Sequence, residues 1–208
     1  MATHTTRSAR YHLTRAFQIL IILIVKVLSR FSTRTDFKEL STGTLADRPY
    51  LIVANHRRAF DPFIICANLP LRYSTKFLPI GFMSHNVFYD SPLRPLMWLA
   101  GCFPARNPRS KHTLFGVDGA VQMLQKQFSI FIFPEGTRVY HKPRGEAHSG
   151  VIRIHAALPQ IPMILCHIEY NKGLGAWLTG NRRIVTYKLI ENPKYDDPEK
   201  LMDDVFAL

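Results

Sequence analysis

The sequence PYLIVANHRRAFDP, residues 49–62, contains an apolar run, a polar loop and a helix start in immediate succession. Its apolar part, 49–54, has the length and composition of a strand buried on both faces of a sheet. Asp61 and Pro62 are typical of a helix start, because aspartate suits the N-cap and proline suits the first helical position. A buried strand followed directly by a helix indicates an α/β layer structure.

The same alternation continues along the chain. Apolar runs predict strands at 128–133, 161–168 and 184–190, and helix signals predict helices at 114–127 and 150–157. No internal repeat occurs, and no linker separates a second domain. We therefore predict a single layered α/β domain over residues 36–208, with a mostly parallel sheet flanked by helices.

Residues 1–35 form a separate basic segment, with six arginine or lysine residues and no acidic residue. An apolar run of thirteen residues, 16–28, is shorter than the roughly 20 residues that a spanning helix needs. We predict an amphipathic helix that lies in the interface of an anionic membrane. A core helix, a spanning segment and a signal peptide remain alternatives, although residues 28–30 offer no small-x-small cleavage site.

The composition limits the classes of partner. The chain has 208 residues, 47% of them apolar, and a net charge of +12, so it can form a core and attracts polyanions. Nucleic acid is disfavoured because most phenylalanines lie in apolar runs and not between basic residues. The three separated cysteines and scattered histidines form no metal motif, which predicts no bound metal and reduced thiols facing the cytoplasm. The acidic segment 191–208 indicates no role.

Two polar segments directly follow predicted strands, at the strand ends where open α/β sheets bind ligands. In the first segment, 55–61, His56 stands five residues before Asp61. A turn into the helix can bring the pair together, with Asp61 holding one imidazole nitrogen and the other nitrogen acting as a general base. The alternative is that Asp61 only caps the helix and His56 is an ordinary loop residue.

The second segment reads FPEGTR, residues 133–138. Gly136 permits a backbone conformation in which amides approach a ligand closely. Arg138 offers a planar fork for phosphate oxygens, and Glu135 can accept hydrogen bonds from a substrate hydroxyl or hold an arginine. A simple turn with surface charges is the alternative.

Together the segments resemble the glycerolipid acyltransferase family, the lysophosphatidic acid acyltransferase-like enzymes. The family motifs are His-x4-Asp, often preceded by Asn, and Phe-Pro-Glu-Gly-Thr-Arg, and both match in full at 55–61 and 133–138. The resemblance extends from about residue 48 to 170. Weaker matches are 101–106, which ends in Arg106, and 161–165, whereas 83–86 and 147–150 depart from the family pattern.

The resemblance implies transfer of a fatty acyl group from acyl-CoA or acyl-ACP to a lysophospholipid hydroxyl, without a cofactor. The implied acceptor is 1-acyl-glycerol-3-phosphate, giving phosphatidic acid, with another lysolipid as the alternative. His56 and Asp61 would be catalytic. The implied substrate-binding residues are Asn55, Arg57, Arg106, Glu135, Gly136, Thr137 and Arg138. The enzyme would sit on the cytoplasmic face of a membrane as a monotopic protein; a basic binding module without catalysis is the competing class.

Overall fold

The computed structural model describes residues 8–29, 33–39, 45–85, 91–106, 115–140, 142–171 and 183–208. Within these residues one sheet contains seven strands in the order β1-β7-β6-β2-β5-β3-β4. The strands are β1 (Thr33–Glu39), β2 (Leu51–Ala54), β3 (Ile80–Ser84), β4 (Cys102–Pro104), β5 (Ser129–Ile132), β6 (Met163–Tyr170) and β7 (Arg183–Ile190). Every neighbouring pair is parallel except β6 and β7, so the predicted mostly parallel sheet is confirmed.

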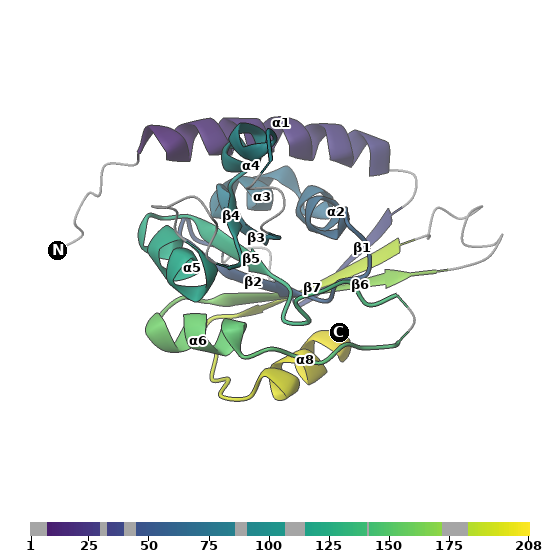
Figure 1. Ribbon diagram of the computed structural model, residues 1–208. Coiled ribbons are helices and arrows are strands. Elements are labelled where there is room, and N and C mark those ends of the chain that lie inside the picture. The colour runs from purple at the N-terminus through teal and green to yellow at the C-terminus, as the bar shows by residue number, and fades with distance from the viewer. Residues whose placement is uncertain are drawn as a thin grey trace.

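Helices cover both faces of the sheet (Figure 1). One layer contains α1 (Ala9–Ser29), α2 (Asp61–Asn68), α3 (Leu71–Phe77) and α4 (Arg94–Leu99). The opposite layer contains α5 (Gly116–Gln125), α6 (Gly150–Ala157) and α8 (Pro198–Phe206). Helix α1 crosses the breadth of the molecule above α2, α3 and α4 (Figure 1). The predicted α/β domain is therefore a three-layer structure.

Strand β2 explains why the sheet has two cores. Its four residues are all buried, and successive side chains point to opposite faces. Ile52 and Ala54 belong to the core under α2 and α3, whereas Leu51 and Val53 belong to the core under α5, α6 and α8. A central strand covered on both faces needs a continuous apolar run, which is what residues 51–54 provide.

Polar side chains hold α1 against the rest of the chain. Gln18 donates from Nε2 to the carbonyls of Ile80 at 2.7 Å and Ala100 at 2.8 Å, and accepts from the Ile80 amide at 2.8 Å. Lys26 Nζ donates to two carbonyls at the end of α2, each at 3.0 Å. The residues that interrupt the apolar run thus face the protein, while Leu20 and Val27 on the outer side are 56% and 70% exposed.

Helix α1 has 21 residues, so it is longer than the apolar run that predicted it. Within the described ranges, it is the helix with the length and apolar composition to cross a membrane. A cavity of about 180 Å³ lies between α1, α2, β3 and α4. Its walls are apolar except for Gln18, whose amide is bonded to the backbone.

Candidate active site

The carboxyl ends of three adjacent strands carry the polar residues of the site. The loop after β2 contains His56 and leads to Asp61, the loop after β5 contains the segment 133–138, and Tyr170 ends β6. Strand β2 lies between β5 and β6, and all three are parallel to one another. The topology therefore brings together residues that are far apart in the sequence.

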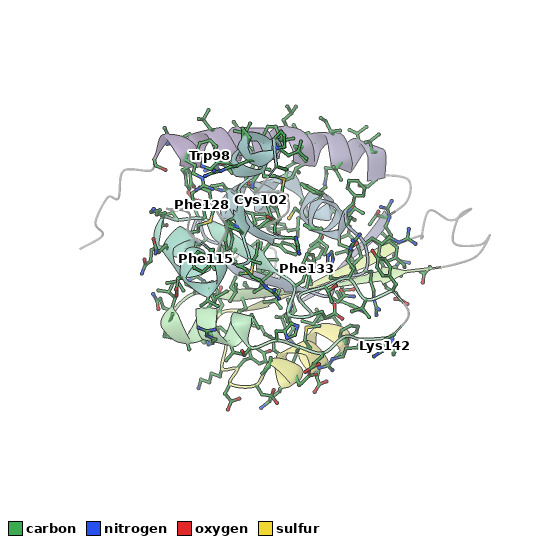
Figure 2. All side chains as sticks on the ribbon, in the orientation of Figure 1. Trp98, Cys102, Phe115, Phe128, Phe133 and Lys142 are labelled. Carbon is green, nitrogen blue, oxygen red and sulfur yellow. The ribbon has the colours of Figure 1, made fainter. Side chains whose placement is uncertain are left out.

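The structure places His56 and Asp61 in contact. The imidazole Nδ1 lies 3.3 Å from Asp61 Oδ2, and the Asp61 side chain is completely buried while that of His56 is 16% exposed. The His56 ring stacks on Phe133 with centroids 3.8 Å apart and planes inclined by 14°. Phe133, which directly follows β5, is half-buried and is labelled near the middle of the view in Figure 2. Phe133 therefore holds one face of the His56 ring and Asp61 holds its Nδ1, so that Nε2 points away from the carboxylate.

Asp61 is the first residue of α2, but its side chain does not cap that helix. Phe60 occupies the N-cap position and makes no side-chain cap bond. The Asp61 carboxylate turns back onto the preceding loop, where Oδ2 accepts hydrogen bonds from the amides of Arg57 and Arg58 at 2.6 Å each. These two bonds hold the His56 loop in place. They also orient the carboxylate so that it faces the His56 imidazole.

Tyr170 was missed by the sequence reasoning. Its hydroxyl donates to Asp61 Oδ1, the carboxylate oxygen that the loop amides do not use. Burial raises the pKa of Tyr170 well above its ordinary value, and the hydrogen bond to Asp61 adds to this effect, so the phenol is a neutral donor. The sequence signal that could have identified Tyr170 was its position at the carboxyl end of β6, a strand that neighbours β2.

Glu135 is an internal tie between two loops. Its side chain is buried; Oε2 accepts from the His56 amide at 2.7 Å and Oε1 accepts from the Gly145 amide at 2.8 Å. Both carboxylate oxygens are therefore occupied within the protein. These bonds fix the backbone of His56 and join its loop to that of Gly145.

Asn55 and Arg57 also bond to backbone. The completely buried Asn55 amide donates to the Ile168 carbonyl at 3.0 Å and accepts from the Ile168 amide at 2.8 Å, which joins the end of β2 to β6. The Arg57 guanidinium donates to the carbonyls of Val139, Lys142 and Pro143. These carbonyls belong to the loop after β5, and Lys142 lies at the outer edge of the molecule (Figure 2). Both residues shape the loops around His56.

The last three residues of the FPEGTR segment face outward. Gly136, Thr137 and Arg138 are exposed, and the Arg138 guanidinium lies 5.5 Å from the centre of the Tyr140 ring. Gly136 has a φ of +63°, a backbone conformation that favours glycine. A Cβ added there would also lie 2.8 Å from His148 Cδ2, so a side chain lacks space. The Arg138 guanidinium is thus presented at the rim of the site, whereas the amides of Gly136 and Thr137 donate to the carbonyls of Phe133 and Glu135.

Arg106 lies at the same edge of the sheet but further along it. It is exposed, directly after β4, two strand positions from β5. The other basic residues of this loop, Arg109 and Lys111, lie outside the described residues.

The acidic C-terminal segment holds the loop that follows the FPEGTR segment. Arg144 pairs with Glu199 and Asp203 of α8, and Glu199 Oε1 also accepts from the Ala147 amide at 2.7 Å. Three carboxylates of the segment are thus used to fix α8 and this loop, since Asp197 accepts from the Glu199 amide at the N-cap of α8. The sequence reasoning assigned this segment no role.

No group of three potential metal ligands occurs among the described residues. All three cysteines are free and buried. Burial raises the pKa of each thiol, that of Cys102 to about 12, so the cysteines are packing residues and not nucleophiles.

Comparison with known proteins gives consistent matches. The profile of the acyltransferase family matches residues 30–168. A probable 1-acyl-sn-glycerol-3-phosphate acyltransferase of Mycoplasma pneumoniae is 26% identical over 130 residues, which are 60% of this chain and 48% of that protein. The chloroplastic 1-acyl-sn-glycerol-3-phosphate acyltransferase BAT2 of Brassica napus is 25% identical over 168 residues, 78% of this chain and 47% of that protein. The chain spans about half the length of the curated relatives it matches.

A solved structure shares the fold. The 1-acyl-sn-glycerophosphate (LPA) acyltransferase PlsC from Thermotoga maritima superimposes with a TM-score of 0.52 at 15% identity, covering 91% of this chain and 77% of that one. The profile match includes both polar loops of the site and strands β1 to β5. On these grounds the chain belongs to the acyltransferase family.

Proposed function

We propose that this protein is an O-acyltransferase that moves a fatty acyl group from acyl-CoA or acyl-ACP to the free hydroxyl of a lysophospholipid. The names of its relatives favour 1-acyl-sn-glycerol-3-phosphate as acceptor, which would give phosphatidic acid. The observation that carries the proposal is the contact between His56 and the buried Asp61, with Nδ1 on the carboxylate and Nε2 directed away from it.

The mechanism needs no group beyond the two substrates. His56 Nε2 accepts the proton of the acceptor hydroxyl as the oxygen attacks the thioester carbonyl carbon. The C–S bond breaks, the acyl–oxygen ester remains, and the proton on His56 passes to the thiolate that leaves. General-base catalysis of this kind is worth roughly 10²–10⁴ in rate.

Asp61 would fix the tautomer of His56 that carries a proton on Nδ1 and would stabilise the imidazolium as it forms. Tyr170 and the two loop amides keep the carboxylate in place, so it does not need to reorganise during the reaction. Glu135 does the same for the backbone of His56. These residues act through His56 and are positioning residues.

The acceptor phosphate would bind between Arg138 and Arg106, both exposed at the carboxyl edge of the parallel strands. Guanidinium groups suit phosphate because they donate two parallel hydrogen bonds.

The acyl chain would enter the cavity under α1. A row of aromatic rings leads from His56 to this cavity: Phe133 contacts Phe131 at 5.0 Å, Phe131 contacts Phe82 at 5.8 Å, and Phe82 contacts Phe63 at 6.0 Å between centroids. Phe82 and Phe63 line the cavity. An apolar path from the base to an apolar cavity suits a fatty chain.

The membrane association would be monotopic, on the cytoplasmic face. Tyr11, Gln18 and Lys26 bond to the domain along a stretch of α1 that spans about 22 Å at 1.5 Å per residue. A helix held along this length cannot cross a bilayer without leaving the domain. Its outer apolar side chains, Leu20 and Val27, are positioned to enter the interface of a membrane.

The test is an acceptor panel with one radiolabelled acyl-CoA, one labelled acyl-ACP and the purified protein in mixed micelles. We expect labelled phosphatidic acid that depends on 1-acyl-sn-glycerol-3-phosphate, and a loss of at least about 10²-fold in turnover for His56→Ala. Product formation by His56→Ala at a tenth of the wild-type rate or more would remove His56 from the base role. Hydrolysis of the thioester without acceptor-dependent product would contradict the whole proposal.

A further inference from the structure

A second pocket lies beside the candidate active site. Its volume is about 500 Å³, and it lies between the C-terminal end of α1, the start of α2 and the ends of β6 and β7 where these two strands pair. Tyr170, which bonds to Asp61, forms part of its wall. The proposed reaction does not use this pocket.

One end of the pocket is basic. Arg58 and Arg183 both line it, and Arg183 is the register partner of Tyr170 across β6 and β7. The Arg58 guanidinium lies 4.5 Å from the centre of the Tyr170 ring, and both arginines act electrostatically on the Tyr170 phenol. The two guanidiniums form a set of donors that suits a phosphate group, whereas the phenol O–H is donated to Asp61.

The other end of the pocket is apolar and open. Phe60 and Leu28 line it and are 71% and 75% exposed, and Ile64 forms the floor between them. Leu28 continues the outer apolar side of α1. Large exposed apolar side chains next to paired arginines fit an amphiphile with an anionic head. A polyanion without an apolar part would leave Phe60 and Leu28 in water.

The pocket is separate from the proposed acceptor clamp. Arg183 begins β7 and Arg106 follows β4, and five strand spacings, about 24 Å, separate these two strands in the sheet. One lysophospholipid headgroup therefore cannot contact Arg183 and Arg106 together.

We propose that this pocket binds an anionic phospholipid of the bilayer, with its phosphate on Arg58 and Arg183 and its acyl chains along Phe60 and Leu28. Such a site would fix the orientation of the protein on a membrane that also supplies the acceptor. The proposal goes beyond acyl transfer and stands on binding alone.

The experiment uses the full chain carrying His56→Ala, so that no turnover occurs and a failure of the enzymatic proposal does not affect the result. Calorimetry measures binding of dioctanoyl phosphatidylglycerol, glycerol 3-phosphate and a short-chain 1-acyl-glycerol-3-phosphate. We expect Arg58→Gln/Arg183→Gln to bind the phosphatidylglycerol about tenfold or more weakly, because charge-assisted bonds to phosphate are lost. Affinity for the lysophosphatidate should change less than about twofold. Arg58→Lys/Arg183→Lys should lose less phosphatidylglycerol affinity than the glutamine variant, because the charge remains although the paired donors are lost.

Two further variants complete the design. Arg94→Gln/Arg153→Gln removes two exposed arginines of α4 and α6 and should bind phosphatidylglycerol like the parent. Phe60→Gln tests the apolar end and should weaken binding of phosphatidylglycerol but not of glycerol 3-phosphate. Unchanged phosphatidylglycerol affinity in the Arg58 and Arg183 double variant overturns the proposal. An equal loss of lysophosphatidate affinity also overturns it, because the pocket would then hold the acceptor, and so does glycerol 3-phosphate binding as tightly as phosphatidylglycerol.

Discussion

Asp61 shows how much of the site is devoted to one carboxylate. A buried carboxylate is costly unless its oxygens are satisfied, and Asp61 receives two amides and a phenol besides facing His56. The two amides belong to the loop between β2 and α2, and the phenol belongs to Tyr170 at the end of β6. The orientation of the imidazole is therefore set by residues that never need to touch a substrate.

Tyr170→Phe tests this positioning role. The variant keeps the ring but removes the donor to Asp61, and a hydrogen bond to a charged group is worth about 1.5–3 kcal/mol, so we expect kcat to fall about tenfold or more. The matched control is Tyr195→Phe, which removes a phenol that donates to Asp204 at 2.6 Å on the exposed side of α8. Steady-state kinetics should show the fall in kcat for Tyr170→Phe alone, with an unchanged acceptor KM. Equal kcat values for the two variants would exclude the role.

At the scale of elements, the loops of the site are fixed by helices that are remote in the sequence. Helix α8 contacts the loop after β5 through Arg144 and buries Leu201, Met202 and Val205 in the core of its layer. The ionic contacts are exposed, and exposed ion pairs contribute at most about 1 kcal/mol. The buried side chains are therefore what holds α8 in place.

Leu201→Ala and Arg144→Ala compare these two contributions. Leu201 is completely buried, so its truncation should lower the free energy of unfolding by about 2–5 kcal/mol. Arg144→Ala should cost about 1 kcal/mol or less. Urea denaturation followed by circular dichroism measures both. A cost for Arg144→Ala equal to that of Leu201→Ala would show that the ionic contacts hold the helix.

Helix α1 allows a test of membrane binding that leaves the fold intact. Deleting residues 1–31 would remove the buried Ile22 and the hydrogen bonds of Gln18, so substitution is the sharper experiment. Leu20→Glu/Val27→Glu places two charges on the exposed side, and we expect the variant to lose flotation with anionic vesicles at moderate salt. The control is Ala156→Glu/Ala157→Glu on the exposed side of α6. Flotation of the α1 variant at the wild-type level would be evidence against the interfacial helix.

At the scale of the whole molecule, the sequence predicted strands that lie in apolar runs. Strands β2, β5, β6 and β7 lie in apolar runs, whereas β1 has the sequence TRTDFKE and β4 has three residues, too polar and too short to detect. Tyr170 could not be found in this way, because it lies 109 residues from Asp61 and only the strand order brings them together. The motifs located His56, Asp61 and the segment 133–138; the supporting contacts required the fold.

Two histidines, the buried His155 and the half-buried His167, make stability depend on pH. Burial lowers the pKa of His155 and of His167 below the ordinary value of 6.5. The unfolded chain then binds protons before the folded chain does, so stability is full above about pH 6.5 and is lost as the pH falls toward the folded pKa values. Each pKa unit by which a folded histidine differs from the unfolded one contributes about 1.4 kcal/mol to the free energy of unfolding.

His155→Gln/His167→Gln should therefore flatten the fall in the free energy of unfolding between pH 6.5 and 5, because the two groups no longer titrate. Urea midpoints at several pH values measure the slope for the wild type and the variant. His148→Gln, an exposed histidine, is the matched control and should keep the wild-type slope. If the double variant loses stability on acidification as steeply as the wild type does, protonation of other groups unfolds the protein and these histidines do not.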